Sequence, residues 1–371
     1  PDKSQYVFGM NQITHYGAAS IWSHGNPNVH WEAATMTNFG LDLNAFRNKL
    51  QFVGEYYYKK AVDMLVQVQL SDIYGKNSAA NPWTNLGEVV NRGFETSITW
   101  RKYEGDFHYS ISGNLATIKN EVIQLAGDNQ PIITNNTTIT QPGNSIGSFY
   151  GFVADGIFQS WDEVNAHAEQ EENTSPGDIK FRDLNKDGIV NDLDRTIIGK
   201  PIPDMTVGLN FEADYRGIDA MVFFQGAFGQ EVYNKHRSNY ALASGNATAK
   251  DWNKVVDVFN YWTPENQSNE MTRISIIDEN RNDRLSTWWL DDASFLRIKT
   301  VQLGYTFPER IVKSVNMSSV RIYVSSTNLY TFTKYRGYDP EINSKDPLES
   351  GIDGGSYPVP RTFLGGIQVN F

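Results

Sequence analysis

Alternation between apolar and polar residues is the property of this chain that most restricts its fold. In residues 107–115 the odd positions are mostly apolar or aromatic, and the even positions are polar. A period of two places successive side chains on opposite faces of a β-strand. The same pattern predicts strands at residues 35–43, 50–58, 94–100, 206–215, 218–228, 296–305, 320–330 and 363–371, with residues 6–11 as a further candidate. The chain is therefore predicted to be all-β.

The links between these strands alternate between short and long. Short links span residues 44–49, 101–106 and 216–217, and one of medium length spans 307–319. The long, polar links span residues 59–90, 116–205, 229–294 and 331–362. A soluble β-sandwich has no reason to place every long loop at one end, whereas a transmembrane β-barrel has short periplasmic turns and long extracellular loops. The strands also approach the ~9 to 11 residues that cross a bilayer at a tilt. A transmembrane antiparallel β-barrel is the predicted fold.

The composition agrees with a wall that is apolar on one face. The mean hydropathy is -0.47, and no apolar run reaches the roughly 18 residues of a transmembrane helix. Aromatic residues make up 13% of the chain. Many lie at or beside strand ends, as in the girdles of both membrane interfaces, namely Tyr56, Tyr57, Tyr58, Trp100, Tyr103, Tyr215, Tyr305 and Tyr330. The alternative is that these rings cap the core of an ordinary sandwich.

Charge and motifs exclude several functions. The net charge of -11 argues against nucleic acid as a partner, and the absence of cysteine excludes disulfides, thiolate metal sites and cysteine nucleophiles. Residues 143–147 match the nucleophile-elbow pattern of hydrolases around Ser145, but they lie in a Thr/Asn/Gly-rich loop rather than between a strand and a helix. The match is interpreted as chance, and the chain is predicted not to be an enzyme.

The strand count and the first residues predict that this chain continues a larger barrel. Residues 1–6 lack the basic, apolar and cleavage-site features of a signal peptide. Single-chain bacterial barrels have even strand numbers and both chain ends in the periplasm, so nine strands leave at least one missing unless residues 6–11 supply it. We expect residues 1–371 to be the C-terminal portion of a barrel, with residues 116–205 as a long extracellular loop.

Residues 183–194 have the spacing of a calcium loop. Oxygen-bearing side chains stand at loop positions 1, 3, 5, 9 and 12, and Gly188 stands at position 6. With the carbonyl at position 7, the predicted Ca²⁺ ligands are Asp183, Asn185, Asp187, Ile189, Asn191 and Asp194. Position 12 is Asp rather than a bidentate Glu, so we expect modest affinity and a structural role. The alternative is an Asx-rich turn held by hydrogen bonds without metal.

Several segments, in the same order along the chain, carry a resemblance to a known family. They are Trp31-Glu32, the turn at 42–48, Tyr56 to Lys60, residues 91–95, residues 177–181 with 183–195 behind them, and Arg297-Ile298-Lys299. Together they resemble the C-terminal barrel region of SusC/RagA-like TonB-dependent outer-membrane transporters of Bacteroidetes, over essentially the whole chain. The terminal Phe371 is similar to the aromatic residue by which outer-membrane barrels are recognised for assembly.

The resemblance implies a 22-stranded barrel in the bacterial outer membrane. It also implies an N-terminal plug and a TonB box outside this chain, and a SusD/RagB-like surface lipoprotein as a lid. The implied function is TonB-dependent import of oligosaccharides or peptides, to which this segment supplies lipid-facing wall, lumen lining and surface loops. The alternative function is a soluble all-β domain that binds or degrades glycans and holds a structural calcium. In the first case Leu209 contacts lipid, and in the second it contacts a protein core.

Overall fold

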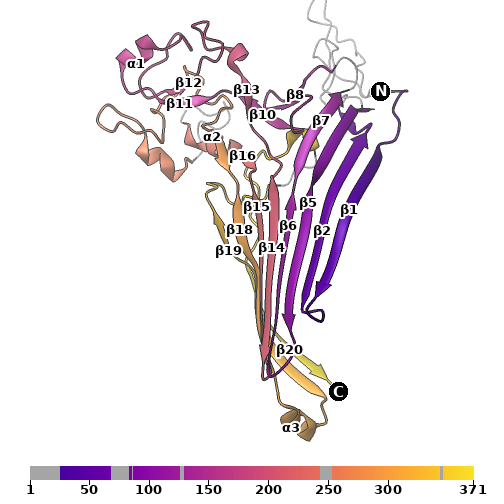
Figure 1. Ribbon diagram of the computed structural model, residues 1–371. Helices are drawn as coiled ribbons and strands as arrows, with labels where there is room; N and C mark the ends of the chain where they lie inside the picture. The colour runs from indigo at the N-terminus through magenta and orange to yellow at the C-terminus, as the bar shows by residue number, and fades with distance from the viewer. Residues whose placement is uncertain (1–25, 68–82, 86, 126–128, 243–252, 343–345) are drawn as a thin grey trace, which may run out of the picture.

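The computed structural model describes residues 26–67, 83–85, 87–125, 129–242, 253–342 and 346–371. Its largest unit is an antiparallel sheet of ten strands, in which strands that follow one another in the chain lie side by side (Figure 1). The order is β1-β2-β5-β6-β14-β15-β18-β19-β20, and β7 pairs with β5. The bounds are β1 (Ala33–Ala45), β2 (Leu50–Val62), β5 (Gly87–Lys102), β6 (Phe107–Thr117), β7 (Lys119–Leu125), β14 (Met205–Tyr215), β15 (Ile218–Phe228), β18 (Phe295–Thr306), β19 (Ser319–Thr333) and β20 (Thr362–Asn370).

Each strand predicted from alternation within the described residues forms part of this sheet. Several strands are longer than predicted, and in particular β2 continues to Val62 and β5 begins at Gly87. These two extensions pair with each other, so the first long link is shorter than residues 59–90. The further candidate at residues 6–11 lies outside the described residues.

Short turns and long links lie at opposite ends of the sheet, as predicted (Figure 1). The turn between β14 and β15 consists of Arg216 and Gly217, with φ of 50° and 90°. Two successive residues with positive φ match the type I′ turn, whose twist suits a β-hairpin. Glycine is required at 217 because a Cβ there would lie 2.6 Å from the carbonyl oxygen of Thr306.

The sheet has one apolar face and one polar face. On β14, Leu209 and Phe211 are 39% and 41% exposed on the apolar face, and Asn210 points to the opposite face. Other large apolar side chains exposed along the strands include Phe39, Leu41, Leu43, Ile98, Ile111, Ile218, Leu303, Ile322, Val324, Phe363 and Ile367. Exposed apolar surface on this scale is what a lipid-facing wall presents.

Aromatic rings border the apolar face at both ends. Near the short turns the rings of Phe46 and Trp100 lie 5.9 Å apart, and toward the long links those of Tyr56 and Phe94 lie 5.1 Å apart. Tyr57, which was predicted with its neighbours as a girdle residue, is instead buried and donates its hydroxyl to the carbonyl of Thr117. The reason is the alternation itself, which turns Tyr57 to the polar face.

The long links have secondary structure of their own, and Figure 1 shows most of it gathered beyond one end of the sheet. A four-stranded sheet has the order β13-β10-β9-β8, and three two-stranded pairs are β3 with β4, β11 with β12, and β16 with β17. Their bounds are β3 (Leu65–Gln67), β4 (Trp83–Asn85), β8 (Ile132–Thr134), β9 (Thr138–Thr140), β10 (Ser148–Gly151), β11 (Ala154–Ile157), β12 (Ile179–Phe181), β13 (Thr196–Gly199), β16 (Glu231–Tyr233) and β17 (Leu290–Asp292).

The helices are short. They are α1 (Trp161–Ala166), η3 (Asp192–Asp194), α2 (Lys235–Ala241), η4 (Val256–Asn260), α3 (Glu309–Val312), η5 (Lys313–Val315) and η6 (Pro347–Glu349). α3 and η5 lie in the medium-length link at the short-turn end of the sheet (Figure 1). Within the described part of the chain, no helix has the length and apolar character needed to cross a membrane.

Candidate functional site: polar face and long links

A cavity of about 770 Å³ lies on the sheet where its strands meet the long links. Glu55 on β2 and Glu95 on β5 both line it and stand directly opposite each other in the strand register. The carboxyl-bearing side chain of Glu341 and the amides of Asn114 and Gln225 belong to the same lining. Carboxylates accept hydrogen bonds and attract cations, so this part of the wall is suited to polar or positively charged groups.

Gln230 contributes a second polar feature to this cavity. Its side chain is buried, and its Nε2 donates to the carbonyl oxygen of Ala293 over 2.7 Å. Its Oε1 is buried and has no hydrogen-bond partner among the described residues. An unsatisfied buried acceptor costs about 1–3 kcal/mol. Gln230 is thus held in the cavity lining by the bond from its Nε2 to Ala293.

Arg297 fixes the link after β19 to the sheet. The residue is 1% exposed, and its Nε donates to Thr331 Oγ1 over 2.8 Å. Its Nη2 donates to Asp339 Oδ1 over 2.6 Å, and its Nη1 donates to Glu341 Oε2 over 2.8 Å. Because Glu341 also lines the cavity, Arg297 determines where one wall of the cavity lies.

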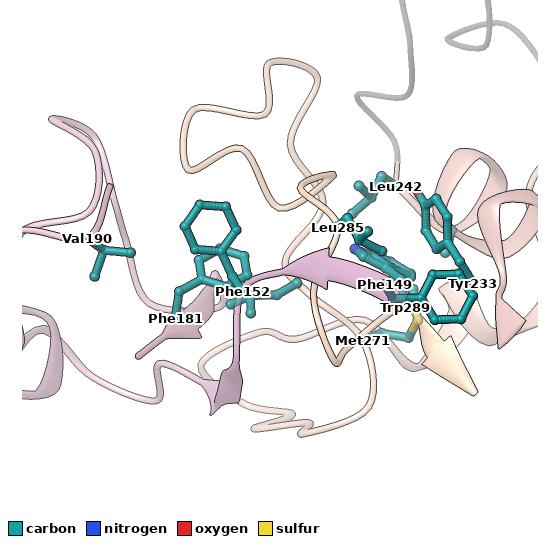
Figure 2. Packing of buried hydrophobic residues seen from close by; sticks show 11 residues of the cluster. Phe149, Phe152, Phe181, Val190, Tyr233, Leu242, Met271, Leu285 and Trp289 are labelled. Carbon is teal, nitrogen blue, oxygen red and sulfur yellow. The ribbon is translucent and has the colours of Figure 1, made fainter. Parts of the chain in front are cut away.

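The second and third long links share one hydrophobic core. Phe149, Phe152 and Phe181 from the link after β6 pack with Leu285 and Trp289 from the link after β15, as Figure 2 shows. The backbones also join, because Phe152 donates to Leu285 over 2.9 Å. Each fully buried aromatic or aliphatic side chain of this kind contributes about 1.5–3 kcal/mol. The two links therefore form a single packed unit above the sheet.

A buried ion pair joins the same two links. The carboxylate of Asp178 is 0% exposed and accepts from Arg273 Nε over 2.9 Å and from Arg273 Nη2 over 3.1 Å. Asn282 Nδ2 donates to the same carboxylate over 3.0 Å. Burial lowers the pKa of Arg273, but the hydrogen bond and charge of Asp178 outweigh it and hold this pKa above its usual value. The guanidinium is therefore a permanent cation in this position.

The first half of the predicted calcium loop is closed by hydrogen bonds from side chains to backbone. Asp183 Oδ1 accepts from Lys186 N over 2.6 Å, and Asp183 Oδ2 accepts from Gly188 N over 2.9 Å. Asn185 Oδ1 accepts from Asp187 N over 2.9 Å. Carboxylate and amide oxygens have two lone pairs each, so one accepted N–H leaves room for a second contact.

Asp194 closes the second half of this loop from a buried position. Its Oδ1 accepts from Leu184 N and Asn185 N over 2.8 and 3.2 Å, and its Oδ2 accepts from Asn191 N over 2.8 Å. Burial raises the pKa of Asp194, but these backbone donors outweigh it and hold the pKa below its usual value. Ile189 is 49% exposed in the same loop.

No group of three or more His, Asp or Glu side chains is gathered as a metal site in the described part of the chain. The network in residues 183–194 therefore matches the Asx-turn account as it stands, and Ca²⁺ binding stays a prediction. The oxygen-only donor set of Asp183, Asn185 and Asp187 is of the kind that Ca²⁺ prefers.

Two further predictions fall on clearly placed residues. Ser145, in the nucleophile-elbow match, donates its hydroxyl to Asn120 Oδ1 over 3.1 Å, and the segment that follows it is strand β10 rather than a helix. The chance interpretation is therefore consistent with the surroundings. Phe371 follows β20 directly and is 90% exposed, so it is accessible to an assembly factor, and its role as a signal stays a prediction.

A sheet that is apolar outside and polar inside, with short turns at one end and large structured links at the other, defines the wall of an outer-membrane β-barrel. The comparison with known families agrees. Residues 4–216, more than half of the chain, match the family described as TonB dependent receptor-like, beta-barrel, and the chain belongs to this family. Its apolar face is thus the lipid face, its polar face the luminal face, and its long links lie outside the cell.

Individual relatives match over almost the whole chain. The TonB-dependent receptor P3 of Formosa agariphila is 33% identical over 98% of this chain and 36% of that protein. SusC of Bacteroides thetaiotaomicron is 28% identical over 99% of this chain and 34% of that protein. The solved structure of the RagAB peptide transporter superposes with a TM-score of 0.78 at 24% identity, over 100% of this chain and 38% of that chain. The chain thus spans just over a third of the length of these proteins.

Family membership settles two of the predictions made from the sequence. TonB-dependent receptors are outer-membrane proteins and not enzymes, so the predicted location and the absence of catalysis are confirmed. The alternative of a soluble domain that binds or degrades glycans is wrong, because the apolar row around Leu209 belongs to a membrane wall.

Proposed function

We propose that this chain is the wall, lumen lining and surface-loop region of a SusC-like importer that takes up oligosaccharides or peptides in a TonB-dependent manner. The observation that carries the proposal is the 770 Å³ cavity with Glu55, Glu95 and Gln230 on its walls, directly beneath the extracellular links. Energy coupling through TonB would reside in a plug and TonB box outside residues 1–371. The peptide class is supported by the similar structure that is described as a peptide transporter, and the oligosaccharide class rests on the resemblance to SusC-like transporters.

The cargo class can be tested on the full-length protein. The complex would be purified from native outer membranes in mild detergent, and co-purified small molecules would be identified by mass spectrometry. The expected result is co-purified peptides or oligosaccharides that no longer support growth of a strain lacking this protein or of a strain lacking TonB. Uptake that continues at the wild-type rate in the deletion strain would contradict the proposal.

The extracellular lid is proposed to be a SusD/RagB-like lipoprotein, on the support of the RagAB structure. Exposed apolar side chains in the link after β15 offer a docking surface, namely Val256, Phe259, Ile276 and Ile277. Phe259 is 87% exposed, so it does not pack within its own loop. Clustered exposed apolar side chains of this kind mark protein-protein interaction sites. Phe259→Asp should reduce co-purification of the SusD/RagB-like lipoprotein, while Ile133→Asp on β8, another exposed site, should not. Equal loss in both variants would remove this surface from consideration.

We further propose a structural Ca²⁺ in residues 183–194, supported by the order of oxygen-bearing side chains and by their free lone pairs. When bound, the ion would be held by Asp183, Asn185, Asp187, Asn191, Asp194 and the carbonyl of Ile189, and would stiffen the loop. The hydrogen-exchange rate of this loop in the full-length protein should decrease when Ca²⁺ is added and return to its initial value when the Ca²⁺ is chelated. In Asp187→Asn the response should weaken. If Ca²⁺ does not change the exchange rate, the loop is held by its hydrogen bonds alone and binds no metal.

A further inference from the structure

Three cationic side chains stand together on the lipid-facing side of the wall, near its extracellular end. They come from neighbouring strands, because Arg92 of β5 is opposite Tyr58 of β2 on one side and opposite Lys119 of β7 on the other. Lys60 lies two residues beyond Tyr58, and alternation therefore places it on the same face. The three strands lie side by side in Figure 1. The three cations thus form one cluster at the extracellular edge of the aromatic rings of that face, with Arg92 beside Tyr58 and Lys60 beyond it.

The height of this cluster on the wall can be obtained from strand geometry. On β2 the lower girdle is at Leu50, which is opposite Trp100, and the upper girdle is at Tyr56 and Tyr58. A strand rises about 3.3 Å per residue and a barrel strand tilts by about 40°, so each residue adds roughly 2.5 Å along the membrane normal. Lys60 therefore lies about 25 Å above Leu50, which equals the height of the apolar band of such barrels. Lys60 is therefore at the level of lipid headgroups, and Arg92 lies beside the upper girdle just below it.

Carboxylates hold the cations in place without neutralising all of them. Lys60 Nζ lies 2.7 Å from Glu88 Oε2. Glu121 Oε2 serves two partners, Arg92 Nη2 at 3.2 Å and Lys119 Nζ at 3.7 Å. Three cations thus share two carboxylates, and the side chains of Lys60, Arg92 and Lys119 remain 37%, 41% and 66% exposed. An ammonium has three donors and a guanidinium five, so each cation retains donors for a further acceptor.

We propose that Lys60, Arg92 and Lys119 form a binding site for the phosphorylated headgroup of an outer-leaflet lipid. Arg and Lys are the side chains that bind phosphate oxygens, the first in a bidentate manner and the second as a point charge. A headgroup rather than a free anion is the expected occupant, because the rings of Tyr56, Tyr58 and Phe94 directly below offer an apolar surface to the attached acyl chains. The proposal rests on membership of an outer-membrane family and not on the proposed transport function.

Native mass spectrometry of the full-length, delipidated protein tests the site with purified diphosphoryl lipid A as the probe. Removing one cation from a lipid-binding cluster lowers affinity by about fivefold, so Lys119→Gln should bind about fivefold more weakly and a variant that also carries Lys60→Gln and Arg92→Gln about a hundredfold more weakly. Arg92→Lys, which keeps the charge, should lie between the wild type and the single variant. The matched control is Lys49→Gln, which removes a cation from another surface ion pair, 2.9 Å from Glu104, at the periplasmic end of the same sheet.

Several outcomes would overturn the proposal. Lipid binding that is unchanged in Lys119→Gln and in the triple variant excludes the site, and an equal decrease in Lys49→Gln shows that the attraction is not local. Lipid A without its phosphates should not bind. If it binds as tightly as the intact lipid, only the acyl chains are recognised and the proposal is wrong. Inorganic phosphate that competes on equal terms would show a free-anion site. If the triple variant fails to assemble, Lys119→Gln and Arg92→Lys still decide the question.

Discussion

Arg321 of β19 forms an ion pair with Asp219 of β15, although β18 lies between these two strands. Arg321 Nε donates to Asp219 Oδ1 over 2.9 Å. The residue of β18 beneath the pair is Gly304, which is opposite Asp219 on one side. A Cβ at position 304 would lie 2.5 Å from Arg321 Nη2 and 2.6 Å from the Asp219 carboxylate. The pair thus clamps three strands of the luminal wall, and glycine makes the crossing possible.

Gly304→Ala should push apart the ends of the Arg321 and Asp219 side chains and weaken this partly exposed ion pair, at a cost of about 0–1 kcal/mol. The measurement is urea unfolding of the full-length protein in lipid, followed by the shift of the folded band on cold gels. Gly365→Ala on β20 is the matched control, since the nearest atom to its Cβ would be 4.0 Å away. Equal stability of the two variants would show that the clamp tolerates a side chain beneath it.

Arg297→Met should leave two carboxylates, Asp339 and Glu341, without their buried cation. Removing one partner of a buried pair costs about 3–5 kcal/mol. The loss should be local, with faster hydrogen exchange at residues 331–342 and at the adjacent strand ends. Lys49→Met breaks an exposed pair and should cost about 0–1 kcal/mol. If exchange in residues 331–342 is unchanged in Arg297→Met, the cavity wall is held by other contacts.

The two faces of β14 can be compared at neighbouring residues. Leu209→Arg places a charge against lipid near mid-strand and should cost about 2–4 kcal/mol or prevent assembly. Asn210→Arg places the same side chain on the luminal face, where water and polar groups can receive it. Folded protein in outer-membrane fractions is the measurement. A larger loss for Asn210→Arg than for Leu209→Arg would reverse the assignment of faces.

The depressed pKa of Asp194 predicts an acid-sensitive loop. Its folded-state pKa lies below the ordinary value of 3.8, so the charged carboxylate stabilises the loop at every pH above that value. This stabilisation is lost as the pH falls through the lower, folded-state pKa. Pepsin-based hydrogen exchange, corrected for intrinsic rates, should show residues 183–194 closed at pH values above 3.8 and opening only as the pH falls below that value. In Asp194→Asn the loop should already exchange faster at the higher pH, with little further change on acidification.

The sequence predicted the wall better than the site. Alternation over about nine residues recurs along the chain, and it located the strands of the large sheet, including those that contain Leu209 and Phe363. Applied position by position, the same alternation would have placed Glu55, Tyr57 and Glu95 on the polar face. The pairing of Glu55 with Glu95 depends on the strand register. The contacts of Arg297 could not be derived in this way. Asp339 is 42 residues away in a link without periodicity, and Asp178 and Arg273 are 95 residues apart in two different links. Such pairs depend on tertiary packing.

Because Phe152 and Trp289 belong to one hydrophobic core, the two largest surface links are expected to evolve together. Recombination could replace one link by the corresponding link of a paralogue. The core residues of the remaining link would then face side chains that do not fit them, and their aromatic surface would be poorly packed. New surface specificity in this wall is therefore expected to arise by exchange of both links together, or by substitutions at their exposed tips. Antibodies raised against one link alone, as a peptide, should fail to recognise the folded surface.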